Sequence, residues 1–526
     1  MANIVKQPCD EGVIRSKPCT APCNQNAKVW VLVATILGSS MAFIDSTVVN
    51  VALPTLQTDL KATVADAQWV VESYALFVAA LILVGGSLGD HLGRRRIFAS
   101  GVALFAIASV WCGFAPNVQQ LVLARGVQGV GGALLIPGSL AIISASFTKD
   151  QRGGAIGLWS GFTAITSAIG PVLGGWLIET LSWRWIFFIN IPLALVVLGI
   201  SFWRVPESRD EEASSNLDWW GALLGVVGLG GVVYGLLESA NVGLSNPVVL
   251  SAIAIGVVVL AAFIVVESRI PSPMMPLTLF RSRTFSGANL LTLLLYSALG
   301  GVLFFLPFNL IQVQGYSATA AGAALVPFPV IIFLLSRWSG GLVSRYGAKL
   351  PLMIGPTVAA VGFGLMALPG TGGSYWTTFF PAVVVLGLGM TICVAPLTTA
   401  VMDAVKVRYA GVASGINNAV SRIASLLSIA ILGIIVLTTF NNSLDKRIAS
   451  LGLPPQAQQF LDTQRINLAA AQVPPGLSNE VSAAVKRAIA SSFVDSFRLV
   501  MLIAVGLAIA SAVTASLMIK NQKKSS

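Results

Sequence analysis

The sequence predicts an all-helical, polytopic membrane protein, and three observations lead to this fold class. The 526 residues are 55% hydrophobic and only 10% charged, whereas soluble domains carry roughly 25% charged residues. The apolar residues come in blocks of about 20, the length that a helix needs to cross roughly 30 Å of hydrocarbon. The basic residues gather in short segments between these blocks. A soluble fold is therefore excluded.

Fourteen apolar blocks are long enough to span a bilayer as helices. The 51 glycines fit this arrangement, because small residues let membrane helices pack closely. An even number of spans places both termini on the same side of the membrane. The expected spans are 29–53, 68–88, 96–115, 119–144, 154–178, 184–203, 217–238, 248–267, 285–311, 320–340, 350–368, 376–402, 412–438 and 493–519.

The distribution of basic residues predicts which side that is. Arg94, Arg95 and Arg96 form one basic cluster, and every second connection after it contains Lys or Arg, as do both tails. The connections between them are nearly free of basic residues, with Lys61 and Arg184 as exceptions. Positive charge in short loops marks the cytoplasmic side. We therefore expect a multi-pass protein of the inner (plasma) membrane with both termini cytoplasmic, and no nucleic-acid partner despite the net charge of +11.

Two short patterns recur along the chain and indicate an internal repeat. The glycine and leucine frame of residues 86–93 returns at 340–347, and the pattern at 152–157 is echoed at 411–415, at nearly the same offset. Both pairs lie in expected cytoplasmic connections, which indicates two halves of the same handedness. Six helices per half account for twelve spans, so the seventh and eighth spans are expected to be an inserted pair.

These patterns predict the order of parts along the chain. The second bundle is expected to contain a long polar external loop at 440–492, with an amphipathic helix near 480–490. The parts are a cytoplasmic N-terminal tail (1–27), a first six-helix bundle (28–205), an inserted helix pair (206–270), a second six-helix bundle (271–520) and a cytoplasmic C-terminal tail (521–526).

Five motifs, found in order along residues 28 to 520, resemble the major facilitator superfamily. Residues 86–95 are similar to its signature between helices 2 and 3, residues 121–131 to its helix 4 motif, and residues 170–175 to its antiporter motif in helix 5. Residues 45–54 and 183–192 resemble the fourteen-helix drug:proton antiporters of the EmrB/QacA type. The resemblance implies the major facilitator fold, with two six-helix bundles and two inserted helices. It also implies proton-coupled export of lipophilic or amphipathic drugs by alternating access, with the proton gradient in place of a cofactor.

The loop after the second span is expected to control the conformation. It contains Gly86, Gly93 and Arg94, and Asp90 lies near its cytoplasmic end. Asp90 can accept hydrogen bonds from a helix N-terminus or pair with arginines. The resemblance implies that it locks the two halves in the outward-open state. The alternative is a simple anchoring loop.

The fifth span is expected to form a tight seam that changes between states. Pro171 removes a backbone hydrogen bond, while Gly170, Gly174 and Gly175 let a neighbouring helix approach closely. We expect these residues to act as structural gates and not as ligand contacts.

Ionisable residues inside the hydrocarbon are candidates for the transport chemistry. Asp45, Glu72 and Arg125 are all expected in the outer half of the membrane, at similar depth. A carboxylate beside an arginine stays ionised, whereas an isolated one in apolar surroundings takes up a proton. We expect proton, arginine and a cationic substrate to compete for these carboxylates. For Glu72 the alternative is a side chain that reaches the outer headgroups.

Other polar residues in the spans are candidates for lining the substrate cavity, each with a helix–helix hydrogen bond as the alternative. Arg422, in the thirteenth span, could pair with Asp45 or Glu72, or favour anionic substrates. The uncharged candidates are Tyr74, Asn309, Gln312, Asn417 and Asn418.

Other function classes find little support in the sequence. Cys9, Cys19 and Cys23 match no strong zinc pattern, and His91 is the only histidine, so neither a metal site nor an enzyme is expected. No P-loop is present for ATP-driven pumping. Uptake or exchange of a specific metabolite and a non-transporting sensor stay as alternatives. The expected partners are a small-molecule substrate, protons and the lipid bilayer, with a periplasmic adaptor and an outer-membrane channel as a further hypothesis.

Overall fold

The computed structural model describes residues 25–147, 149–209, 218–270, 273, 275–405 and 410–520, apart from some side chains within the helices. Cys9, Cys19, Cys23 and both chain ends lie outside the described residues. Where the chain is described, its regular structure is entirely helical. This agrees with the predicted fold class.

Two long helices of the first bundle, Val64–Leu92 and Val118–Ser146, begin at side-chain caps. The Thr63 hydroxyl accepts a hydrogen bond from the Asp66 backbone N–H, and the Asp66 carboxylate accepts one from the Thr63 N–H. Asn117 caps the helix that contains Arg125. Such reciprocal caps satisfy backbone donors that have no partner within the helix. The helices are α2 (Gln25–Asp59), α3 (Val64–Leu92), α4 (Arg94–Phe114), α5 (Val118–Ser146), α6 (Lys149–Thr180), α7 (Trp185–Phe188) and α8 (Asn190–Arg204).

The inserted pair consists of α9 (Trp219–Val242) and α10 (Pro247–Arg269), which pack closely against each other. Gly231 and Gly256 face one another, and a Cβ on either would meet the backbone of the other helix. On its other side, α9 contacts α3 and α17, whereas α10 is largely exposed and so faces lipid. The pair is therefore attached to the edge of the molecule where the two bundles meet.

The second bundle repeats the six-helix plan with more interruptions. Its first span, the ninth of the chain, continues from α11 into a π-helical turn, and Pro327 divides the next span into two helices. The helices are α11 (Arg283–Phe308), η2 (Asn309–Val313), α12 (Ala318–Leu325), α13 (Pro327–Tyr346), α14 (Lys349–Met366), α15 (Tyr375–Thr378), α16 (Phe380–Asp403), α17 (Ala410–Ile448) and α19 (Asn479–Met518).

The number of spans agrees with the prediction of fourteen. Thirteen of the described helical segments are long and apolar enough to cross a membrane. The fourteenth is α6, a 32-residue helix that lies between α2 and α12. At 1.5 Å per residue this helix is also long enough to cross the hydrocarbon.

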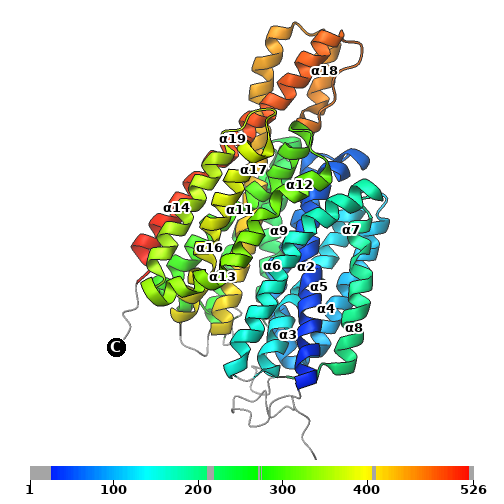
Figure 1. The fold of residues 1–526 in the computed structure, drawn as a ribbon. Helices are drawn as coiled ribbons and strands as arrows, with labels where there is room; N and C mark the ends of the chain where they lie inside the picture. Colours follow the sequence, from blue (N-terminus) through cyan, green and yellow to red (C-terminus); the bar gives the residue numbers. More distant parts are fainter. Residues whose placement is uncertain are drawn as a thin grey trace, which may run out of the picture.

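The polar connection expected at 440–492 is largely helical, and it includes the helix expected near 480–490. Helices α17 and α19 extend beyond the bundle and join α18 (Pro455–Gln464) and the 3₁₀ turn η5 (Arg465–Ala470) in a helical hairpin, which stands out from one end of the molecule (Figure 1). Arg447 pairs with Asp495 at 2.7 Å, and Arg465 pairs with Asp445 and Asp462. The segment is too polar to cross a bilayer, but buried apolar residues at helical spacing, such as Leu444, Ile448, Val485 and Ile489, pack its helices together.

The two bundles meet along two seams. In one, α3 packs on α17; in the other, α6 packs on α12 and α13. The start of α2 and the end of α19 lie at the same end of the molecule, opposite the hairpin (Figure 1). We call these two ends the terminal side and the hairpin side.

Candidate functional site

A buried ion pair links the first and fourth spans. Arg125 on α5 donates to Asp45 on α2, with 2.5 Å between Nη1 and Oδ2, and the two side chains are 1% and 0% exposed. The sequence predicted both residues at similar depth, and the structure brings them into direct contact. A buried pair of this kind needs further hydrogen bonds to offset its desolvation.

Neutral side chains supply these hydrogen bonds. Gln128 donates from Nε2 to Asp45 Oδ1 at 2.9 Å and to Ser109 at 2.8 Å, while its Oε1 accepts from Arg125 at 2.6 Å. Asn190 donates to Asp45 Oδ1 at 3.4 Å and to Ser109 at 3.2 Å. Four helices, α2, α4, α5 and α8, thus contribute to one closed polar cluster. We call these five residues the Asp45 cluster.

Gln128, Asn190 and Ser109 were not predicted as site residues. Gln128 lies three residues after Arg125 in the helix 4 motif, so it shares a helix face with the arginine. Asn190 lies within the motif at 183–192. A polar side chain in an apolar span, within a motif already singled out, was the signal that could have identified both. Ser109 gave no comparable signal, because serine is common in membrane helices.

The remaining contacts of Arg125 are with α3 and α7. Its Nε donates to the backbone carbonyl of Val70 at 3.0 Å, and its guanidinium lies 4.4 Å from the ring centre of Tyr74 and 5.9 Å from that of Phe187. Cation–π contacts of this type stabilise a desolvated guanidinium. Tyr74, predicted as a cavity residue, is 4% exposed and packs on Arg125. Arg125 therefore has neutral acceptors and an aromatic face in addition to Asp45.

Glu72 does not join the Asp45 cluster. Its side chain is 0% exposed, and neither carboxylate oxygen has a hydrogen-bond partner in the described part of the chain. Because it is fully buried, the side chain does not reach the headgroups. It lies one turn after Gln68, which donates to the carbonyl of Ile429 on α17, and one turn before Leu76, which packs with α9 and α17. Glu72 is thus a separate buried acid near the seam between the two bundles.

The polar residues of α17 have different surroundings. Arg422 makes no ion pair with Asp45 or Glu72, although it lies close enough to Tyr74 for electrostatic interaction. Asn417 donates to Asn289 at 3.1 Å and to Thr292 at 2.7 Å on α11, which is a helix–helix hydrogen bond. Asn418 is exposed and bonds to its own helix. The roles of these residues in a substrate cavity stay predictions.

Two further cavity candidates lie at the hairpin side. Gln312 donates to Gln57 of the first bundle at 3.2 Å, and Gln57 in turn donates to the carbonyl of Asn467 in η5 at 3.4 Å. Asn309 is buried and accepts from Gln314 at 3.1 Å. Both bundles and the hairpin are therefore hydrogen-bonded to each other at this end.

The glycines of α6 form a tight seam, as the motif predicted. A Cβ on Gly170 or Gly174 would collide with Thr47 or Val48 of α2. On the adjacent face, a Cβ on Gly175 would lie 2.5 Å from the Ala318 carbonyl of α12. In the reverse direction, Gly322 of α12 packs against the Pro171 backbone. The helix α6 is thus held between α2 of its own bundle and α12 of the other.

An acid next to this seam adds a contact between the two bundles. Glu179 accepts hydrogen bonds from the Thr319 backbone N–H at 2.8 Å and from the Thr319 hydroxyl at 2.7 Å. Desolvation would raise the pKa of Glu179, which lies beyond the expected span, but these hydrogen bonds outweigh it and lower the pKa. Together with Gln312 and the α6 glycines, this contact closes the hairpin side.

The loop after the second span is held by a residue that the sequence analysis did not single out. Gly93 has φ +111°, which favours glycine, and a Cβ there would lie 2.7 Å from Glu207. Glu207 accepts from the Arg95 N–H at 3.0 Å and lies 3.5 Å from Arg96. The Arg94 N–H donates to the carbonyl of Ser208. The segment after α8 thus fixes the loop within the first bundle.

Two other residues of this loop, Gly86 and Asp90, were predicted to control the conformation. Gly86 on α3 packs on Pro137 of α5, at an ordinary contact distance. The side chain of Asp90 lies outside the described residues, so its lock with the other bundle stays a prediction.

Comparison with known proteins agrees with this architecture. Residues 35–429 match the Major Facilitator Superfamily. The chain is 34% identical over 427 residues to the multidrug resistance protein Stp of Mycobacterium tuberculosis, covering 80% of this chain and 78% of that protein. It is 31% identical to the tetracenomycin C resistance and export protein of Streptomyces glaucescens, covering 92% and 90%.

A solved structure is similar in fold. It is that of a bacterial homologue of the human lysosomal transporter Spinster, in an inward-facing and unoccupied conformation. The TM-score is 0.66 at 18% identity, and the match covers 95% of this chain and 100% of that one.

Proposed function

This chain belongs to the major facilitator superfamily, and we propose that it exports lipophilic or amphipathic small molecules in exchange for protons. As a member of that family it is a multi-pass membrane transporter and not an enzyme. The names of its relatives, which describe resistance to and export of antibiotics, support the direction of transport and the substrate class. The fold alone does not distinguish export from uptake.

The observation that carries the proposal is the buried pair between Asp45 and Arg125. Protonation of Asp45 would remove the charge that compensates Arg125 and leave a guanidinium buried without a counter-ion. This state is costly, so proton binding must be accompanied by a rearrangement of the cluster. The carbonyls of Val70 and Gln128 and the ring of Tyr74 are available to hold Arg125 when Asp45 is neutral.

A short chain of contacts can carry this rearrangement to the other bundle. Thr47 and Val48 follow Asp45 on α2 and are the residues that Gly170 and Gly174 of α6 contact. On its next face, α6 packs on α12 through Gly175 and Gly322. A small movement of α2 would therefore disturb the seam that closes the hairpin side. The contacts between α2 and α6 and those between α6 and α12 are both tightly packed, so the helices are expected to switch between discrete arrangements.

We propose that the hairpin side is external and the terminal side cytoplasmic. The positive-inside distribution of Lys and Arg supports this orientation. The contacts of Gln57, Gln312 and Glu179 then close the external side, as in a state that exchanges with the cytoplasm. Proton binding from outside and substrate binding from inside would occur in alternation.

An adaptor that carries the substrate past an outer membrane remains a further proposal. The hairpin of α17, α18 and α19 is the part of the chain that extends beyond the bundle on this side (Figure 1). Deletion of α18 with its flanking turns would test whether export in cells depends on it.

Transport of a cationic dye in inverted membrane vesicles tests the main proposal. We expect wild-type protein to accumulate dye when an acid-inside proton gradient is imposed, and to stop when the gradient is collapsed. Asp45→Asn should abolish gradient-driven accumulation and retain dye exchange, and Glu72→Gln would show whether the second acid contributes. The matched control is Asp462→Asn, an exposed residue of the hairpin. Accumulation that persists without a gradient would exclude antiport, and dye movement in the opposite sense would favour uptake.

A further inference from the structure

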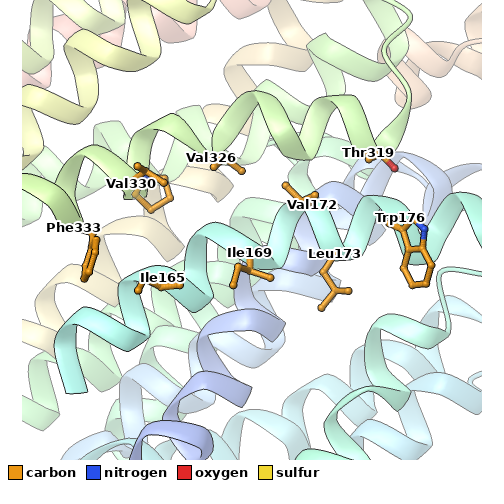
Figure 2. Close-up of a pocket in the computed structure, with 10 residues that line it drawn as sticks. Ile165, Ile169, Val172, Leu173, Trp176, Thr319, Val326, Val330 and Phe333 are labelled. Atoms are coloured by element: carbon orange, nitrogen blue, oxygen red, sulfur yellow. The ribbon is translucent and has the colours of Figure 1, made fainter. Parts of the chain in front are cut away.

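A groove lies over the seam between α6 and α13, on the outer surface of the helices. Its volume is about 540 Å³, within the usual range of roughly 300–1,000 Å³ for ligand pockets. Figure 2 shows Ile165, Ile169 and Trp176 along α6 on one wall, and Val330 and Phe333 of α13 on the other. The groove is therefore built from both bundles.

The groove faces the bilayer and not the Asp45 cluster. Gly170 and Gly174 mark the face of α6 that packs on α2, and Gly175 marks the face that packs on α12. Ile169 and Trp176 lie on the remaining face and are 48% and 51% exposed. In a membrane-spanning helix, such a face is covered by lipid.

The walls offer almost nothing to a polar ligand. Of the lining residues that the structure describes, those with polar groups are Trp176, through its indole, and Thr319, whose hydroxyl already donates to Glu179. Among the described residues, none of those that line the groove carries a charge. Burying a polar group there would leave its hydrogen bonds unmade, at a cost of a few kcal/mol, so the occupant must be hydrocarbon.

The dimensions of the groove correspond to one lipid chain. The stretch of α6 from Ile165 to Trp176 is about 16 Å long at 1.5 Å per residue. This is close to half of the roughly 30 Å hydrocarbon core. Ile165 lies near the middle of α6 and Trp176 near its end at the hairpin side, and tryptophan is the residue type enriched at headgroup level. A chain lying in the groove would reach from the headgroups to the bilayer centre.

We propose that this groove binds one acyl chain of a phospholipid from the leaflet on the hairpin side. Because its two walls belong to different bundles, the groove exists in this form only while α6 and α12 are in contact. The bound lipid chain therefore stabilises the state in which the hairpin side is closed, because a ligand favours the conformation to which it binds.

Photo-crosslinking tests the site. The purified protein is reconstituted in vesicles of phosphatidylethanolamine and phosphatidylglycerol, which contain a small fraction of phosphatidylcholine with a diazirine in the middle of one acyl chain. After illumination, adducts are mapped by peptide mass spectrometry. We expect them to concentrate on residues 165–176 and 326–333. Adducts spread evenly over the lipid-facing helices would overturn the proposal.

Two variants fill the groove from opposite walls. Val330→Trp and Ile169→Trp should each remove most of the adducts, because the added indole occupies the space of the lipid chain. The control is Leu334→Trp, on the same helix as Val330 but outside the lining and 68% exposed; it should leave labelling unchanged. Equal labelling in all three variants would exclude the groove as the binding site.

A competition experiment distinguishes a lipid from a transport substrate as the occupant of the groove. An excess of a lipophilic cationic dye should leave the adducts unchanged if the occupant is a phospholipid chain. Displacement of the adducts by dye would overturn the lipid assignment and make the groove a substrate site.

Discussion

The two bundles share one fold but hold their helices together with different chemistry. In the first bundle, α2, α4, α5 and α8 meet in a buried cluster with a full ion pair, Asp45 and Arg125. In the described part of the second bundle, helices within the membrane are joined by neutral polar contacts, such as Asn417 with Asn289 and Thr292. Only the charged cluster changes its net charge when it binds a proton. On this comparison we propose that the first bundle couples to protons, while the second provides the partner against which it moves.

The largest expected effect comes from breaking the charged cluster. Arg125→Met should lower the free energy of unfolding by about 3–5 kcal/mol, because it leaves a carboxylate buried without its counter-ion. Thermal unfolding in detergent and vesicle transport are the two measurements.

A double variant separates stability from coupling. Adding Asp45→Asn to Arg125→Met should recover part of the lost stability, since the uncompensated charge is gone, yet gradient-driven transport should stay absent. Additive losses in the double variant would show that the two residues do not form an energetic pair.

The next effect concerns the seam that links the bundles. Gly322→Ala places a methyl group against the Pro171 backbone, where nothing flexible can move aside. Overpacking of this kind costs about 1–3 kcal/mol, and here it should act on the closed state and shift the population toward opening on the hairpin side. Labelling of a cysteine introduced at Gln57 would report the opening. Gly199→Ala, where a Cβ meets open space, should leave labelling as in the wild type.

A smaller effect is expected in the neutral contacts of the second bundle. Asn417→Leu removes the hydrogen bonds to Asn289 and Thr292, which should cost about 1–3 kcal/mol because two polar partners stay buried. Proton-driven transport should be retained at a reduced rate. Loss of gradient dependence in this variant would contradict the division of roles between the bundles.

The smallest effect is the pH dependence of the contact between Glu179 and Thr319. Because the folded, closed state lowers the pKa of Glu179, the contact contributes fully at pH values above the ordinary carboxyl pKa and is lost as the pH falls through the lowered value. Acid on the hairpin side should therefore favour opening. In Glu179→Gln, opening on the hairpin side should no longer depend on acid pH. If the pH dependence is unchanged in this variant, another titratable group causes it.

Much of the fold followed from local patterns in the sequence. The fourteen spans, the inserted pair and the paired bundles were predicted from apolar block length and a short repeat. For residues 440–492 the sequence predicted a polar connection with a helix near 480–490, but not the hairpin of α17, α18 and α19, because hydropathy distinguishes membrane from water and not loop from helix in water.

The candidate site followed from the sequence in outline only. Charge in an apolar span identified Asp45, Arg125 and Glu72, since each is costly to bury. Gln312 was a candidate for the cavity with a helix–helix hydrogen bond as the alternative, and only the structure identified its partner as Gln57 of the other bundle. Such pairings depend on how distant helices are rotated against each other.

The sequence by itself therefore determined the class, the number of helices and which residues are costly enough to need partners. It did so because burial in lipid is a property of each segment, read from composition and period. Only the tertiary structure decided that Asp45 meets Arg125, that Glu72 stands apart, and that α6 carries a seam on one face and a groove on another. These facts depend on contacts between residues far apart in the chain, and no local pattern specifies which side chains the packing of helices brings together.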